Sequence, residues 1–349
     1  MYRTDSEVLY DNILGTDIIS TSEKLQIKID AYVNDFSNYD DIKLNEQAKD
    51  KSLRDIFFLE REIIDDIQNV FSKNFIPTQI EYSFIKTRNT NIITNNRNNR
   101  KIIIIPVSWS KFYFGVLVYL RLLKRQYDDE IEMGNIYRNL LIYVDSMYCR
   151  NRLMPESVDK EFPENVFLLG NDAGTISDIL YIMFAFIICH EISHIVLNHD
   201  DSDTKLFEHE NEADITGYAM FLKWLSGMKE GKSKVSECFD FNEMFYNAPK
   251  LFFKICDMCN QYKKIVYGEN SINNLYPTFI ERNKNIEQIE KGKNIQWNRV
   301  CEKLDMKIDF HTFSLDNPLS INLEQAIVYF IRTTEIKSQA GKLDSIKRW

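Results

Sequence analysis

The feature that most constrains the fold is an unbroken apolar run of 11 residues, Ile179–Cys189. A helix that is apolar on every side has to be buried in the protein interior or in a membrane. Because a membrane-spanning helix needs roughly 20 apolar residues, the run predicts a buried core helix. Thr175 or Ser177 is the expected N-cap, and the helix is expected to end near Asn198.

Two histidines follow the apolar run on the same predicted helix. The segment His190-Glu191-Ile192-Ser193-His194 has the spacing H-E-x-x-H. Residues four apart share one helix face, about 5–6 Å apart at Cβ, so His190 and His194 can bind one metal ion. Glu191 can reach a water on that ion and act as a general base. Such an ion needs at least a third protein ligand.

The third ligand is expected from an acidic segment that reads as a helix from about Phe207 to Gly227. One face of that helix carries two carboxylates and two small residues, Glu210, Asp214, Ala213 and Gly217. The small residues would let this face approach the first helix closely. The spacing therefore favours Glu210 as the metal ligand, with Asp214 orienting a ligating histidine. Glu212, on another face, is the alternative ligand.

Two further histidines compete for the same role. Four of the five histidines lie between positions 190 and 209, a concentration that core packing does not require. A metzincin site would need Gly at 197 and His at 200, where this chain has Leu197 and Asp200. His199 is expected to point away from His194 and to cap the helix C-terminus. His209 is expected to be a solvated loop residue.

Together, H-E-x-x-H and the E-x-x-A-D sequence of Glu210–Asp214 resemble the paired motifs of gluzincin metallopeptidases. The E-x-x-A-D form is similar to the HtpX and CAAX-prenyl-protease branch. The short gap between the motifs and the sequence FAFIICHEISHI resemble the Lit-type phage-exclusion peptidases. A fainter likeness links Tyr276–Arg282, YPTFIER, to the H-P-x-x-x-x-R element of these peptidases, with Tyr276 in place of His. The resemblance spans Ile179–Arg282.

The resemblance implies a zincin-like catalytic core in which His190, His194 and Glu210 hold Zn²⁺. It also implies a small sheet beside the motif helix, whose edge strand pairs with an extended protein or peptide substrate. The implied activity is that of an endopeptidase, with a phage-defence or toxin-like role. Hydrolysis also needs a donor to the developing oxyanion. The candidates are Tyr276, Arg282, His311 and Tyr218, and the sequence does not choose among them.

Two other functions are compatible with the same residues. A catalytically silent interaction or regulatory module could bind a metal ion while Glu191 has no catalytic task. A helical core with an accidental motif would bind no metal.

Composition and charge narrow the class of protein. The 349 residues are 44% apolar and 27% charged, as in an ordinary globular protein, and the net charge of −9 argues against a nucleic-acid partner. The six cysteines show no disulfide framework, and the first residues lack the pattern of a signal peptide. We therefore expect a cytoplasmic protein with no membrane partner, of an oligomeric state that the sequence does not give.

The periodicity of the whole chain predicts an α+β fold that is mainly helical. Short β-branched runs predict strands at Ile80–Ile85, Asn91–Thr94 and Lys101–Ile105, with a further strand at Leu25–Ala31. Further helices are expected at Glu46–Lys73, Ser108–Lys124, Met133–Cys149, Ala248–Tyr267 and Leu323–Ile336. We expect an N-terminal lobe of helix and strands over residues 1–106. A helical metallopeptidase core would span 107–270, and a helical C-terminal section 271–349.

Overall fold

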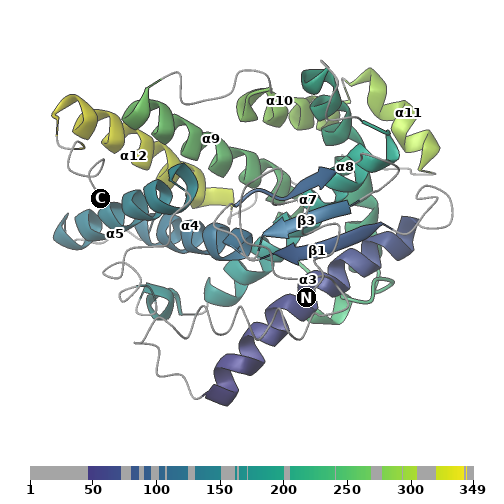
Figure 1. Ribbon diagram of the computed structural model, residues 1–349, viewed down its shortest axis with the longest axis horizontal. Helices are drawn as coiled ribbons and strands as arrows, with labels where there is room; N and C mark the ends of the chain where they lie inside the picture. Colours follow the sequence, from purple (N-terminus) through teal and green to yellow (C-terminus); the bar gives the residue numbers. More distant parts are fainter. Residues whose placement is uncertain are drawn as a thin grey trace, which may run out of the picture.

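A computed structural model shows a mainly helical protein with one small sheet, which confirms the predicted α+β class (Figure 1). It describes residues 46–71, 80–85, 90–95, 102–106, 108–124, 130–150, 162, 165–170, 172–199, 205–239, 241–268, 277–292, 294–304, 320–341 and 343. The strand predicted at Leu25–Ala31 lies outside these residues.

The sheet has three strands in the order β1-β3-β2, and each strand overlaps its predicted range. The bounds are β1 Glu81–Ile85, β2 Ile93–Asn95 and β3 Ile102–Pro106. The central strand β3 pairs in parallel with β1 and antiparallel with β2, so that Ile103 lies opposite both Tyr82 and Thr94. Ile103, Ile104 and Ile105 are all buried, so β3 is covered on both faces.

The helices are α3 (Glu46–Phe71), α4 (Ser108–Lys124), α5 (Glu130–Val144), η2 (Asp145–Cys149), α7 (Asp172–Val196), α8 (Leu206–Lys229), η3 (Ser236–Cys238), η4 (Glu243–Asn247), α9 (Ala248–Tyr267), α10 (Phe279–Glu290), α11 (Ile295–Lys303) and α12 (Ser320–Gln339). The helix predicted over Met133–Cys149 begins earlier, at Glu130, and its last residues form a π-helix. The predicted N-cap of α7 was wrong, since the helix begins at Asp172. That carboxylate accepts a 2.9 Å hydrogen bond from Arg121 Nε.

Helix α7 is the core of the molecule. Nearly every residue from Ile179 to Ile195 is buried, and α3, α4, α8 and α9 all pack against it. In Figure 1 the sheet lies in front of α7 and α3 runs below it. By length and composition α7 could cross a membrane, but 89% of its most apolar stretch is buried inside the protein. That burial is the one expected for a core helix.

A buried carboxylate fastens α3 to the far end of α8. Asp66 of α3 accepts hydrogen bonds from Trp224 Nε1 at 2.8 Å, Ser233 Oγ at 2.5 Å and the Lys234 backbone N–H at 3.1 Å. One continuous core joins all three predicted sections of the chain, since Ile64, Phe184 and Phe330 belong to it. The section boundaries themselves remain a prediction.

A second buried carboxyl on α3 makes stability depend on pH. Glu60 packs under the first turn of α4, where it accepts a 2.5 Å hydrogen bond from Ser110 Oγ. Burial raises the pKa of Glu60 from 4.5 to about 7, although the Ser110 hydrogen bond acts in the opposite direction. Between these two values the folded chain holds a proton that the unfolded chain has lost. The contribution of Glu60 to stability is therefore greatest below pH 4.5 and falls as the pH rises to 7.

We predict that Glu60→Gln removes this pH dependence. Relative to the wild type, the variant should gain on the order of 3 kcal/mol in free energy of unfolding between pH 4.5 and pH 8, because each pKa unit corresponds to about 1.4 kcal/mol. Urea unfolding of both proteins across this range measures the difference. A difference that stays constant with pH would contradict the prediction.

Candidate metal centre

Three side chains from two helices converge where α7 leaves the core. His190 and His194 lie on α7 and Glu210 lies on α8, and one ligand atom of each lies within 4.8 Å of the other two. The two Nε2 atoms are 3.1 Å apart, and the Glu210 carboxylate oxygens lie 3.5 Å from His190 Nε2 and 3.6 Å from His194 Nε2. Ligands at zinc bond lengths on a tetrahedral ion are separated by about 3.3 Å. His190, His194 and Glu210, hereafter the metal group, therefore have the spacing to hold one metal ion.

Helix α8 reaches this position because a glycine lets the two backbones touch. A Cβ placed on Gly217 would lie 2.7 Å from His190 Cα and 2.9 Å from His190 N, closer than real Cβ atoms approach. Ala213, one turn earlier, is fully buried in the same contact. This confirms that the small face of α8 approaches α7 closely. It also brings Glu210 and Asp214 to the end of α7.

Asp214 orients one of the histidines. Its Oδ1 lies 3.0 Å from His190 Nδ1, and its side chain is fully buried. Because a carboxylate only accepts hydrogen bonds, Nδ1 of His190 carries a proton, so Nε2 is the nitrogen that would bind a metal ion once it has lost its own proton. Helical spacing predicted this contact.

A buried arginine from α10 closes the group from the opposite side. Arg282 donates to Asp214 from Nε at 2.9 Å and from Nη2 at 2.7 Å, and its Nη1 lies 3.0 Å from Glu210 Oε2. Its guanidinium also lies over the rings of Phe253 and Phe279, at 4.9 and 5.6 Å. The cation thus offsets the charge of both carboxylates. As a result, its donors face these two carboxylates, a contact that the sequence did not predict.

The sequence before Arg282 builds the turn that directs it. The Thr278 Oγ1 atom accepts from the Glu281 backbone N–H at 3.2 Å, and the Glu281 carboxylate accepts from the Thr278 backbone N–H at 2.8 Å. This reciprocal pair is a capping box, which starts α10 at Phe279. Asn285 then donates to Asn211 of α8 at 2.7 Å. The T-x-x-E pattern could have predicted this start from sequence.

The sequence predicted that His199 points away from His194, and this prediction was wrong. Asn198 adopts a left-handed conformation with φ of 58°, and the His199 backbone N–H returns to the His194 carbonyl at 3.0 Å. This Schellman-type ending folds the chain back under α7. The two Nδ1 atoms of His194 and His199 therefore lie 3.0 Å apart.

The outer histidine contacts two residues of α8. His199 Nε2 lies 3.1 Å from Glu212 Oε2, and the His199 and His209 rings stack at 4.1 Å. His209 is helical and half-buried, so its assignment to a solvated loop was wrong. Glu212, the alternative ligand, meets His199, whereas Glu210 meets both histidines of the group.

Glu191 is buried beside the metal group. Burial raises its pKa to about 7, although His190 and a hydrogen bond from Thr94 act in the opposite direction. Thr94 Oγ1 of β2 also donates to the Glu191 backbone carbonyl at 3.2 Å, which ties the sheet to α7 at this residue. A carboxyl with a pKa near neutrality is suited to general-base chemistry, and a bound cation would lower the value from there.

The pKa values of the two histidines and of Glu210 differ, and a metal ion would have to displace a proton from His190 but not from the other two. Burial opposes protonation of His190, but hydrogen bonds to Asp214 and Glu210 raise its pKa to about 9. Burial lowers the pKa of His194 to about 3. Burial raises the pKa of Glu210, but Arg282 and His190 outweigh it and hold the pKa below its usual range. His194 is therefore an available neutral ligand and Glu210 an anionic one.

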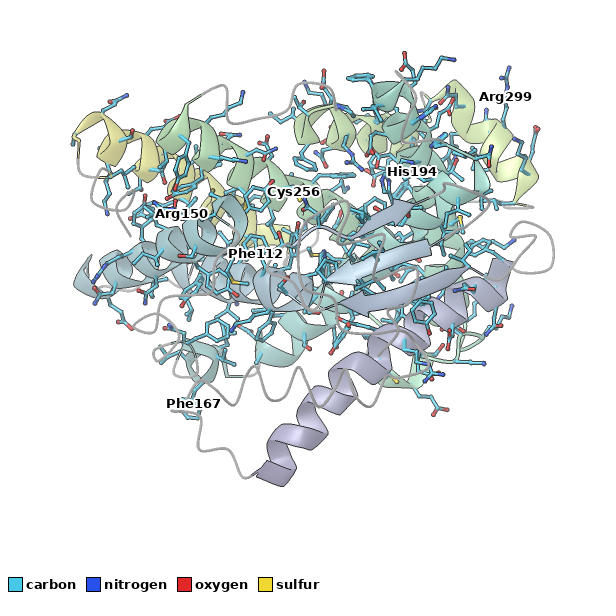
Figure 2. All side chains as sticks on the ribbon, viewed as in Figure 1. Phe112, Arg150, Phe167, His194, Cys256 and Arg299 are labelled. Carbon is cyan, nitrogen blue, oxygen red and sulfur yellow. The ribbon has the colours of Figure 1, made fainter. Side chains whose placement is uncertain are left out.

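The group opens into a cleft of about 1200 Å³. Its walls come from β2, α4, α7, α8, α9 and the start of α10, and its apolar side is lined by Trp109, Tyr113, Phe186 and Phe252. Figure 2 labels His194 and Cys256, which both line the cleft from different helices. Cys256 and Cys259 are buried free thiols of α9.

The other candidate donors to the oxyanion are Tyr276, His311 and Tyr218. Tyr276 and His311 lie outside the described residues. Tyr218 is buried, and its hydroxyl donates to Glu290 of α10 at 2.9 Å, away from the metal group. Comparison of the chain with protein-family profiles, curated proteins and solved structures gives no match.

We predict that Gly217→Ala both destabilises the fold and weakens metal binding. The new methyl group would push α8 away from the His190 backbone, and overpacking of this kind costs about 1–3 kcal/mol, against at most about 1 kcal/mol gained in helix propensity. Urea unfolding and zinc titration measure the two effects.

Gly227→Ala is the matched control on the same helix. A Cβ there meets nothing within 4 Å, so this variant should gain about 0.5–1 kcal/mol and bind zinc like the wild type. Equal behaviour of the two variants would show that the helices do not depend on close contact at Gly217.

Proposed function

We propose that the protein is a zinc-dependent endopeptidase of gluzincin type. The observation that carries the proposal is the convergence of His190, His194 and Glu210 beside the buried carboxyl of Glu191, at the wall of a large cleft. Imidazole and carboxylate ligands suit Zn²⁺. The resemblance of the H-E-x-x-H and E-x-x-A-D sequences to the gluzincin motifs supports the same class of enzyme. We also propose that the helical core has a zincin-like fold.

Each residue of the group has a task in amide hydrolysis. His190, His194 and Glu210 would hold the ion, and Asp214 would orient His190. When bound, zinc would supply Lewis acidity, lowering the pKa of a water and polarising the scissile carbonyl. Glu191 would take a proton from the attacking water and pass it to the leaving nitrogen as the C–N bond breaks.

The position of β2 supports a peptide or protein as the substrate. Among the described strands β2 pairs only with β3, and residues Thr90–Thr94 line the cleft next to Glu191. An extended peptide can add to such an edge by backbone hydrogen bonds, while side-chain pockets provide specificity. The aromatic wall of Trp109, Tyr113 and Phe252 offers an apolar pocket for one side chain. We propose an intracellular, phage-defence or toxin-like role from the Lit-type resemblance alone.

Metal analysis tests the ligand set. We predict about one zinc ion per chain in the wild type and in Glu212→Gln, whose amide oxygen can still accept a hydrogen bond from His199. We predict loss of zinc in Glu210→Gln, because Glu210 lies beside both histidines. Elemental analysis of purified protein, with circular dichroism to verify folding, measures this. Loss of zinc with Glu212→Gln instead would keep a metal site but change its third ligand. Wild-type protein without zinc would refute the proposal.

A Glu191→Gln variant separates an enzyme from a silent metal-binding module. We expect it to keep its zinc, since Glu191 is not a ligand, and to lose on the order of 10²–10⁴-fold in peptide hydrolysis, the usual contribution of a general base. Cleavage of a peptide library by the two zinc-loaded proteins gives the comparison. A zinc-loaded wild type without any cleavage would favour the silent module.

A further inference from the structure

The ligating histidine His194 heads a chain of contacts that leads out of the metal group to the protein surface. His194 Nδ1 lies 3.0 Å from His199 Nδ1, and His199 Nε2 lies 3.1 Å from Glu212 Oε2. His199 is buried, whereas the Glu212 side chain is 47% exposed. The contacts thus run from metal ligand through one histidine to a carboxylate in contact with solvent.

The proton positions in this chain follow from its outer end. The Glu212 carboxylate accepts, so Nε2 of His199 carries a proton and donates it. A neutral imidazole has one N–H, so Nδ1 of His199 is an acceptor, and the proton between the two rings belongs to Nδ1 of His194. Nε2 of His194 therefore keeps its lone pair. The opposite assignment would bring two acceptors, His199 Nε2 and the Glu212 carboxylate, into contact at 3.1 Å.

We propose that His199 and Glu212 are positioning residues that fix the tautomer of His194 and so direct its Nε2 lone pair at the metal ion. Asp214 does this for His190 with one carboxylate, while His194 depends on a histidine placed between ligand and carboxylate. The inference rests on the proposed metal centre. We call the series of contacts from His194 through His199 to Glu212 the relay. It depends on the left-handed conformation of Asn198, which turns the chain back and places His199 beside His194.

The tautomers can be observed directly. Long-range proton–nitrogen correlation spectra of isotope-labelled protein distinguish the two neutral forms of each ring, and the chain has only five histidines to assign. With zinc added, and again after chelation, we expect the proton on Nε2 of His199. With zinc we also expect it on Nδ1 of His194. His199 protonated on Nδ1 alone would overturn the relay.

Zinc affinity provides the second measurement. His199→Phe keeps the aromatic stack but removes the acceptor, and should weaken zinc binding 10–100-fold, the usual effect of losing a partner of a ligating histidine. His199→Asn can still accept and donate, and should recover part of that loss. His209→Phe, which keeps the ring stacked on His199, is the matched control and should bind zinc like the wild type.

The outcomes separate this inference from the proposed function. Zinc-loaded wild type with unchanged affinity in His199→Phe would overturn the relay and leave the metal centre intact. Equal losses in His199→Phe and His199→Asn would point to packing and also overturn it. Wild type without zinc would refute the metal centre, and with it the task assigned to His199.

Discussion

The arrangement of the site depends on one contact between two helix backbones. Gly217 of α8 lies directly against the backbone of His190 of α7, and Gly217 has no room for a methyl group. Because the contact is made at a residue of the metal group itself, any change in the separation of the helices changes the distance from Glu210 to the histidines. The position of the third ligand is thus set by packing of rigid elements rather than by a loop, which is the more precise way to hold a site.

The polar group lies at the end of an otherwise apolar helix, and burial determines its chemistry. From Ile179 to Cys189 α7 has no charged side chain, and the next residue, His190, already faces Asp214 and Arg282. Charges at such a place are costly unless paired. Two carboxylates and one guanidinium form that pairing here, with the histidines between them. Burial acts to lower the pKa of both His190 and His194, but hydrogen bonds to Asp214 and Glu210 outweigh it at His190 and raise the pKa there.

Much of the fold could be predicted because the spacing of apolar residues along the chain indicates which face of a helix or strand is buried. The apolar pattern predicted the ends of α4, α9 and β3 to within one residue. The small residues on one face of α8 predicted the close contact at Gly217. The contributions of Arg282 and His199 could not be predicted in the same way. Arg282 reaches the site by tertiary packing of α10, and His199 by the backbone reversal at Asn198. Helical spacing describes only residues that stay on the helix, and both residues lie beyond its reach.

Arg282 has a consequence for the charge balance at the end of α7. Its contacts with Glu210 and Asp214 bring one positive charge against two negative ones. The guanidinium therefore offsets the repulsion between two buried carboxylates that lie one helical turn apart. This counter-charge comes from α10, 68 residues after Asp214 in the sequence. Loss of the packing between α10 and α8 would thus leave two buried negative charges without their partner.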